Sequence, residues 1–415
     1  MGDLLELKNI ENASFNLNGI AKYTSLEQNL RLSEKYDCEV YLKREDLQQV
    51  RSYKIRGAFN KISSLTDEER SKGVICASAG NHSQGFAFSC FKLGITGTVY
   101  MPTTTPKQKV NKVKMFGKDR ITVVLTGDTF DDANAEAQKH CVRENLTFVH
   151  PFDDQKVMEG QGTVGKEIFE TEKDIDMLFL PVGGGGLFAG VSSYFKQKSP
   201  NTKLIGVEPE GAPALKMALD AGKVVELDSI DKFVDGAAVK KVGLKTFDII
   251  KQTIDDLILV PEGKTCSTIL DLYVQEAIVV EPAGALTIAC LDFYKEQIKG
   301  KKIVCVVSGS NNDIDRMGEI RERSLIYEGL KHFFIVRFPQ RAGALKQFVS
   351  QVLGPNDDIT RFEFVKKNFK ESGPALVGIE LENKDDFQGL TERMSEFGIN
   401  YTYVNDDPSL FEFFV

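Results

Sequence analysis

The stretch MLFLPVGGGGLFAG (177–190) joins an unbroken apolar run to four consecutive glycines and a second apolar segment. The first run is typical of a strand buried on both faces of a parallel sheet, and the segment after the glycines favours a helix. Glycine amides at such a turn can approach an anion closely, and a helix N-terminus favours negative charge. The stretch therefore predicts an α/β fold with a phosphate site at this turn.

The same alternation of strands and helices continues through the first three quarters of the chain. The expected strands cover residues 73–78, 96–102, 120–127, 177–183, 203–211, 255–263 and 301–311. The expected helices cover residues 82–94, 106–117, 129–145 and 187–200, with Thr129 and Asp131 as candidate N-caps of the third. Strands joined in this way form parallel sheets, whose ligands bind beyond the carboxyl ends of the strands. The loops that fall there are 78–81, 182–187 and 306–312.

Near residue 320 the pattern changes. A charged stretch at 315–329 is interpreted as a linker. The expected order after it is strand, helix, strand, strand, helix, strand, at 332–339, 341–354, 358–367, 374–383, 383–398 and 399–405. This order predicts a small α+β domain of the ferredoxin-like type, for which we expect a binding or regulatory role.

Composition narrows the class of protein. The 415 residues exceed one ordinary core and predict two or three domains. A net charge of -8 argues against nucleic acid and anionic membranes as partners. Seven cysteines without a CxxC pair, and only four histidines, suggest neither a zinc site nor a disulfide framework. With no signal-peptide core and no apolar run long enough to span a bilayer, we expect a soluble cytoplasmic protein.

Lys54, in RSYKIRGAFN (51–60), is the first residue that could carry chemistry. A desolvated lysine has a lowered pKa, is nucleophilic and can form a Schiff base with an aldehyde. The alternative is a solvated lysine at the start of a helix, which is the commoner case. Lys54 alone does not decide between them.

Two further turns add candidate site residues. In SAGNHSQG (78–85), Asn81 can donate a side-chain N–H, and the loop amides can hold a carboxylate at the start of the following helix. His82 could be a general base, but a packing role is favoured. In VVSGSNN (306–312), Ser308 is either a helix cap or a hydrogen-bond partner for a neutral ring nitrogen.

The glycine turn also allows a different function. Gly184, Gly186 and Ala189 fit the spacing of a dinucleotide fingerprint, and Glu208 ends the next strand about 20 residues on. This reading would make the protein a nicotinamide oxidoreductase. The fingerprint is weak alone, and it leaves Lys54 unexplained.

Taken together, SYKIRGA, SAGNHSQG, VGGGGL and SGSN resemble the fold-type II pyridoxal-phosphate enzymes and, more narrowly, the biosynthetic threonine dehydratases. The resemblance covers essentially the whole chain and departs mildly at Tyr53 and Ser310. It implies a catalytic domain at 1–320 with two parallel-sheet α/β subdomains, the smaller inserted at roughly 55–155. It also implies one ACT-like regulatory domain at 325–415.

The resemblance implies a role for each matching residue. Lys54 would hold pyridoxal 5'-phosphate as a Schiff base, Asn81 would bond the ring hydroxyl and Ser308 would meet the ring nitrogen. The phosphate would lie against Gly183, Gly184, Gly185, Gly186 and the amide of Leu187. The substrate carboxylate would be held by Ser78, Ala79, Gly80, Asn81 and His82.

The implied reaction converts L-threonine, with L-serine as a second substrate, to an oxo acid and ammonia. For threonine the product is 2-oxobutanoate, in the first step of isoleucine biosynthesis. A homodimer or homotetramer is expected. The alternatives are a catabolic serine/threonine dehydratase, a serine racemase, threonine synthase or β-replacement enzyme, and a catalytically dead amino-acid sensor.

Two additional sites are implied by the same resemblance. Glu208 stands where related enzymes hold a monovalent or divalent cation, so a cation is a further candidate ligand. In FPQRAGAL (338–345), Arg341, Gly343 and Leu345 are candidates for binding isoleucine or valine as effectors. The alternative for this turn is an ordinary helix start that packs against a partner domain.

Overall fold

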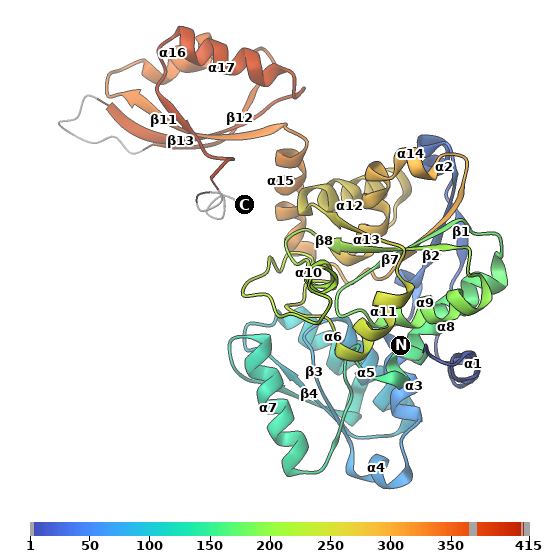
Figure 1. Cartoon of the computed structure of the whole chain (residues 1–415). Helices are drawn as coiled ribbons and strands as arrows, with labels where there is room; N and C mark the ends of the chain where they lie inside the picture. The colour runs from blue at the N-terminus through green and yellow to red at the C-terminus, as the bar shows by residue number, and fades with distance from the viewer. Residues whose placement is uncertain (1–3, 365–371, 408–409, 411–415) are drawn as a thin grey trace. The chain divides into compact units, whose positions relative to one another are not determined.

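A computed structural model of the chain describes residues 4–364, 372–407 and 410 (Figure 1). It divides into two compact units. The first comprises Met1–Glu262 with Leu272–Asn312, and the second comprises Gly263–Asp271 with Asp313–Val415. In the described ranges, no helix is both long enough and apolar enough to span a membrane.

The larger sheet of the first unit has six strands in the order β1-β2-β10-β7-β8-β9. Every neighbouring pair is parallel except β1 and β2, which are antiparallel. The strands are β1 (Leu26–Gln28), β2 (Glu39–Arg44), β7 (Met177–Pro181), β8 (Lys203–Pro209), β9 (Asp256–Val260) and β10 (Lys302–Val307). The parallel sheet confirms the expected α/β class. Strand β2 was not predicted, because its EVYLKR sequence carries charges between its apolar residues.

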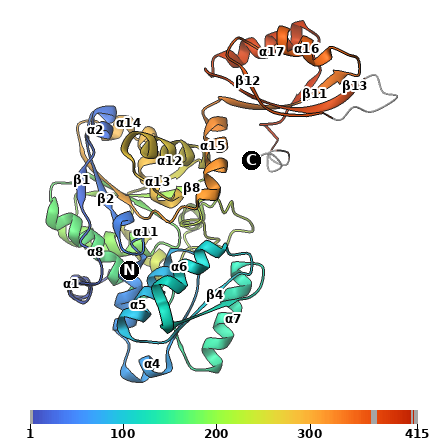
Figure 2. The same ribbon diagram turned by 180° about the vertical axis from the view of Figure 1, so that it is seen from behind.

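The smaller sheet is entirely parallel, in the order β5-β4-β3-β6. Its strands are β3 (Val74–Ala77), β4 (Gly97–Met101), β5 (Ile121–Leu125) and β6 (Thr147–Phe148). Alternate residues of β3 face opposite sides: Cys76 packs in a core with residues of α5 (Asn81–Leu93), and Ala77 in another with residues of α7 (Phe130–Arg143). Figures 1 and 2 show α5 and α7 on opposite faces of this sheet.

The helix starts largely follow the sequence signals. Thr129 caps α7 in a reciprocal capping box with Asp132. The candidate cap Asp131 is wrong, because it lies inside the first turn of the helix.

The remaining helices of the first unit are α1 (Leu7–Asn16), α2 (Leu30–Tyr36), α3 (Lys54–Ser63), α4 (Asp67–Lys72), α6 (Lys107–Gly117), α8 (Gln155–Thr171), α9 (Gly186–Lys198), α10 (Ala214–Ala221), α11 (Leu244–Thr253), α13 (Pro282–Ala289) and α14 (Lys295–Ile298). Helix α12 (Glu262–Glu276) contributes residues to both units.

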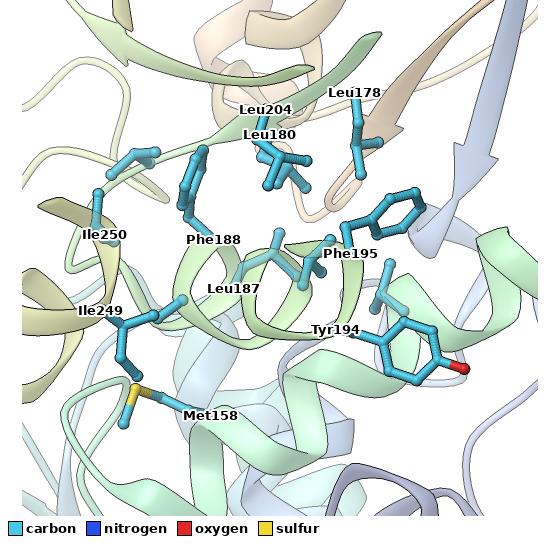
Figure 3. Close-up of a cluster of buried hydrophobic side chains, with 14 of the residues drawn as sticks. Met158, Leu178, Leu180, Leu187, Phe188, Tyr194, Phe195, Leu204, Ile249 and Ile250 are labelled. Atoms are coloured by element: carbon cyan, nitrogen blue, oxygen red, sulfur yellow. The ribbon is translucent and has the colours of Figure 1, made fainter. Parts of the chain in front are cut away.

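Helix α9 is the centre of the main hydrophobic core (Figure 3). Its Leu187, Phe188 and Phe195 are buried with Leu178 and Leu180 of strand β7. Burying a large apolar side chain contributes roughly 1.5–3 kcal/mol. The core therefore fixes the helix that begins at the glycine turn.

The second unit contains a four-stranded antiparallel sheet in the order β12-β13-β11-β14. Its elements are β11 (Lys331–Pro339), α16 (Ala344–Gln351), β12 (Asp358–Phe364), β13 (Ser372–Glu380), α17 (Asp386–Glu396) and β14 (Tyr401–Tyr403). This order confirms the predicted ferredoxin-like class. The part of the expected strand at 365–367 lies outside the described residues.

The stretch predicted as a linker is instead helical. Helix α15 (Met317–Tyr327) buries Ile320 and Ser324, and Arg323 pairs with Glu319 one turn earlier at 2.9 Å. Within the second unit, the Ser324 hydroxyl lies 3.0 Å from that of Ser267 in α12. Of its charged residues, Arg321 is exposed, whereas Glu319, Glu322 and Arg323 are half-buried, so a charged sequence that is typical of a linker forms a packed helix here.

Candidate active site

The lysine helix and the Ser308 loop are joined by their backbones. The amide of Tyr53, just before α3, donates to the carbonyl of Ser308 at 3.1 Å. Ser52 and Gly309 also form a β-bridge. Ser308 is buried at the end of β10. The two sequence-predicted residues Lys54 and Ser308, 254 positions apart, thus come from adjoining segments.

The Lys54 side chain is half-buried and held at a defined place. Its Nζ donates to the carbonyl oxygen of Pro151 at 2.8 Å and lies 5.4 Å from the centre of the Tyr53 ring. Burial lowers the pKa of Lys54 to about 8, against an opposing effect of Glu281. A substantial fraction of the amine is therefore neutral near physiological pH, as a nucleophile or base requires.

The glycine turn is closely covered by other parts of the chain. A Cβ on Gly184 would lie 2.3 Å from the Phe152 ring, and one on Gly183 would lie 2.6 Å from the carbonyl of Ala237. Gly185 has φ of +89°, a backbone conformation that favours glycine. The first amides of α9 have no partner within the helix, by helix geometry. The turn can therefore present several N–H groups to a phosphate, with no side chain of its own intervening.

The segment after β6 links the lysine to the glycine turn. Pro151 accepts the Lys54 hydrogen bond, and Phe152 packs on Gly184. His150 Nδ1 accepts the amides of Phe152 at 3.2 Å and Asp153 at 2.7 Å. Burial lowers the pKa of His150 to about 4, so its ring is neutral with the proton on Nε2. Sequence reasoning missed this segment, whose signal is HPFDD between a strand and a helix.

The loop at 78–82 leads into α5. The amide of Gly80 donates to the Ser78 hydroxyl at 3.2 Å, and Ser83 donates to the Gly80 carbonyl at 2.6 Å. His82 is buried, with Nε2 2.9 Å from the Val149 carbonyl, and burial lowers its pKa to about 3. This geometry favours a packing role for His82. The carboxylate site at residues 78–82, Ala79 included, stays a prediction.

Asn81 is held by two residues that sequence reasoning did not assign. Its Nδ2 donates to Glu281 Oε1 at 2.6 Å, and its Oδ1 accepts from Asn311 Nδ2 at 2.7 Å. Glu281 is buried, and burial raises its pKa to about 7. The available signal was a lone carboxylate within the otherwise apolar run IVVEPAGALTIACL (278–291).

Glu208 has a structural role that explains its position. Its two carboxylate oxygens accept the amides of Leu215 at 2.7 Å and Lys216 at 2.9 Å, at the start of α10. Burial raises the pKa of Glu208 to about 8. These bonds leave it poorly suited to bind a ribose, which disfavours the hypothesis of a nicotinamide oxidoreductase.

Among residues 4–364, 372–407 and 410, no group of three or more metal-ligating side chains is assembled, so the cation site at Glu208 stays a prediction.

The predicted effector residues lie at the start of α16 in the second unit. Arg341 donates to Gln347 Oε1 at 2.5 Å, Gly343 has φ of +83°, and Leu345 is exposed. The turn is accessible, and its role as an effector site stays a prediction.

The first-unit residues fit pyridoxal phosphate. The glycine turn offers a phosphate cradle that a larger residue at Gly184 would obstruct. Lys54 offers a partly neutral amine, and Asn81 and Ser308 are polar groups at neighbouring loops. This set of groups matches the phosphate, aldehyde and ring of the cofactor.

Comparisons with known proteins agree with this geometry. Residues 18–309 match the family model "Pyridoxal-phosphate dependent enzyme", and residues 322–414 match "C-terminal regulatory domain of Threonine dehydratase". The chain is 57% identical over 412 residues to an L-threonine dehydratase biosynthetic IlvA of Halalkalibacterium halodurans, covering 99% of each chain.

Two solved structures are also similar. The processed form of threonine deaminase isoform 2 from Solanum lycopersicum has a TM-score of 0.72 and 40% identity, covering 78% of this chain and 96% of that one. A serine racemase from Dictyostelium discoideum has a TM-score of 0.69 and 32% identity, covering 75% and 99%.

Proposed function

The chain belongs to the pyridoxal-phosphate dependent enzymes, and we propose that it dehydrates and deaminates L-threonine to 2-oxobutanoate and ammonia. This reaction is the first step of isoleucine biosynthesis. The observation that carries the proposal is the pairing of Lys54 with the glycine turn through the segment at 150–152. The choice of threonine rests on the full-length relatives and on the C-terminal regulatory domain.

Each site residue has a role in this proposal. The amides at 183–187 would bind the cofactor phosphate, Asn81 the ring hydroxyl and Ser308 the ring nitrogen. The loop at 78–82 would hold the substrate carboxylate. When bound, pyridoxal phosphate supplies an electron sink for the pair left at the substrate α-carbon.

Lys54 would act as the general base at that carbon. Its lowered pKa makes the amine able to accept a proton near neutral pH, and the Pro151 carbonyl holds it in place. Ser308 is a neutral partner for the ring nitrogen, whereas an aspartate would favour a long-lived carbanion. The neutral partner suits prompt loss of the β-hydroxyl as water.

The regulatory and assembly assignments are part of the same proposal. Isoleucine or valine would bind at Arg341, Gly343 and Leu345, in a regulatory domain at 325–415 that follows a catalytic domain at 1–320. The family matches, which end at 309 and begin at 322, support this division. A cytoplasmic homodimer or homotetramer using serine as a second substrate completes the proposal.

A lysine substitution tests the assignment of the cofactor. The wild-type protein should show an absorbance band at about 410 nm when loaded with pyridoxal phosphate. Lys54→Ala should lose both the band and threonine turnover, whereas Lys61→Ala on the same helix should retain both. Normal threonine turnover by Lys54→Ala would contradict the assignment of Lys54 as the residue that holds the cofactor.

A further inference from the structure

Asn81, Glu281 and Asn311 form a closed ring of three hydrogen bonds. Asn81 Nδ2 donates to Glu281 Oε1 at 2.6 Å, and the Asn311 backbone amide donates to Glu281 Oε2 at 3.1 Å. Asn311 Nδ2 closes the ring by donating to Asn81 Oδ1 at 2.7 Å. The three residues come from α5, from the segment before α13 and from the loop after β10. The ring therefore joins loops that adjoin the cofactor site from both sheets of the first unit.

The orientation of the Asn311 amide is set by its surroundings. Its Nδ2 also donates to the backbone carbonyl of Val50 at 2.9 Å, and its Oδ1 accepts from Lys112 Nζ at 3.3 Å. A flipped Asn311 would place its oxygen against the Val50 carbonyl and its NH₂ against the Lys112 ammonium. Both contacts would be repulsive, so the amide has one favoured orientation.

That orientation determines the orientation of Asn81 in turn. A flipped Asn81 would face the NH₂ of Asn311 with its own NH₂ and the carboxylate of Glu281 with its oxygen. As observed, one N–H of Asn81 is used by Glu281. The described residues form no hydrogen bond with its second N–H.

The fold makes room for the Glu281 carboxylate at this place. A Cβ on Gly309 would lie 2.4 Å from Glu281 Oε1, and one on Gly236 would lie 3.2 Å from it. Gly309 directly follows Ser308, the predicted partner of the ring nitrogen. A buried carboxylate is costly to maintain, which indicates that Glu281 serves the site rather than the stability of the fold.

We propose that Glu281 and Asn311 are positioning residues, which orient Asn81 so that its second N–H is presented to the ring hydroxyl of the cofactor. This inference rests on the proposed function, since it concerns the same cofactor. It assigns a role to two residues that do not themselves need to touch the substrate.

The test compares two cofactor forms in equilibrium binding to the apo full-length protein. The probes are pyridoxal phosphate and its analogue lacking the ring hydroxyl. Wild type should prefer pyridoxal phosphate by about five- to tenfold, the contribution of one hydrogen bond. Glu281→Gln nearly preserves the size and shape of the side chain. It replaces one carboxylate oxygen with an NH₂ group, although the Asn81 side chain and the Asn311 amide each need an acceptor at this position. In Glu281→Gln, the affinities for pyridoxal phosphate and for the analogue should differ by no more than about twofold. The affinity for the analogue should be nearly the same as in wild type.

Three variants separate positioning from a general loss of structure. Asn311→Ala removes the other half of the ring and should abolish the preference as well, which keeps the test valid if Glu281→Gln does not fold. Asn81→Ala should give the same loss. Glu159→Gln removes a buried carboxylate that also accepts two side-chain hydrogen bonds, away from this ring, and should keep the wild-type preference.

The outcomes distinguish the two proposals. If the wild-type protein binds neither pyridoxal phosphate nor the analogue, the proposed function is overturned. A wild-type preference that persists in the folded Glu281→Gln or Asn311→Ala protein would overturn the positioning role alone. An equal loss of affinity for pyridoxal phosphate and for the analogue in these variants would also overturn the positioning role, because a purely structural role predicts that result.

Discussion

At the residue scale, two of the residues proposed to contact the cofactor are held by hydrogen bonds to other parts of the chain: Asn81 by Glu281 and Lys54 by Pro151. Lys54, Asn81 and Ser308 stand at turns with recognisable local patterns. Glu281 and Pro151 act through neighbours that are 200 and 97 positions away in sequence. Local periodicity contains no information about such pairs, so they appear only when the chain is folded.

The Lys54 amine makes a prediction about pH. Its folded-state pKa of about 8 lies below the usual value for lysine, about 10.4. The neutral amine reacts with an aldehyde, so the rate at which apoprotein gains its absorbance band should rise with pH and level off above about pH 8. Stopped-flow absorbance measures this rate. A midpoint near that of an unperturbed lysine would contradict the burial of this amine.

The lowered pKa of Lys54 also makes the stability of the folded protein depend on pH. Between the folded and unfolded pKa values, the unfolded chain binds a proton that the folded chain has released. The contribution of Lys54 to the free energy of unfolding therefore rises with pH across this window.

Gly184 makes a second residue-scale prediction. Its Cβ would lie 2.3 Å from the Phe152 ring, so Gly184→Ala should displace that ring and distort the phosphate cradle. We expect at least a roughly tenfold rise in the dissociation constant of pyridoxal phosphate, equivalent to about 1.4 kcal/mol. Equilibrium absorbance titration measures it. Gly318→Ala, whose Cβ meets open space, is the control, and equal behaviour of the two variants would refute the prediction.

At the element scale, helix α8 holds the lysine helix and the glycine-turn helix together. A Cβ on its Gly160 would lie 2.6 Å from the Arg56 carbonyl in α3, and one on Gly190 of α9 would lie 2.6 Å from the amide of Gly162 in α8. Close backbone contact of this kind fixes the spacing of helices. The alternation of strands and helices in the sequence predicts α9, but no element is predicted from it at the position of α8.

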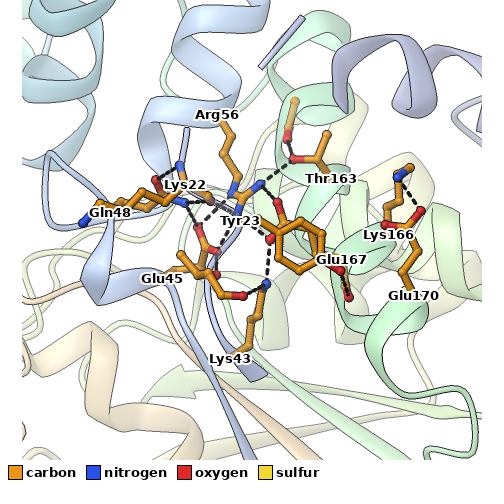
Figure 4. Close-up of polar contacts among 12 residues, drawn as sticks. Lys22, Tyr23, Lys43, Glu45, Gln48, Arg56, Thr163, Lys166, Glu167 and Glu170 are labelled. Atoms are coloured by element: carbon orange, nitrogen blue, oxygen red, sulfur yellow. Dashed lines mark hydrogen bonds and ion pairs between the residues drawn. The ribbon is translucent and has the colours of Figure 1, made fainter. Parts of the chain in front are cut away.

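An ion cluster strengthens the contact between α3, α8 and the larger sheet (Figure 4). Arg56 bonds both oxygens of Glu45 and both oxygens of Glu167, and Lys43 donates to Glu167 at 2.6 Å. Burial alone would lower the pKa of the Arg56 guanidinium, but the two carboxylates raise it overall. Arg56 and Glu45 lie in the same stretch, KREDLQQVRSYKIR (43–56), but the cluster is completed by Glu167 on the distant helix α8, which the local sequence does not reveal.

Breaking this cluster should be costly. Arg56→Met leaves two buried carboxylates with only Lys43 to balance them, so we expect a loss of about 3–5 kcal/mol in the free energy of unfolding. Urea denaturation followed by circular dichroism provides the measurement. Lys139→Met, which breaks an exposed pair with Glu136, should leave the midpoint unchanged. A small effect at Arg56 would mean that water or rearrangement compensates the charges.

At the scale of the whole molecule, the class of each unit was predictable because strand and helix order is local information. The antiparallel β11–α16–β12–β13–α17–β14 unit followed from such order alone. The order of strands within the six-stranded sheet did not, since it depends on which strands meet after long crossovers. Helix α15 was missed because its burial depends on a partner segment in α12.

The regulatory proposal is tested on the intact protein. Isoleucine or valine should change the concentration of threonine that half-saturates the enzyme, because an effector acts by binding two states unequally. Arg341→Ala should weaken that response, and Arg361→Ala on β12 is the control. An unchanged response in Arg341→Ala would place the effector elsewhere.

We propose that Lys54 and the glycine turn form the active site of a threonine dehydratase. The most direct measurement is the steady-state release of 2-oxobutanoate and ammonia from L-threonine by the purified protein loaded with pyridoxal phosphate. We predict equal amounts of both products from wild type and none from Lys54→Ala. Products from both proteins alike, or none from cofactor-loaded wild type, would contradict the assignment.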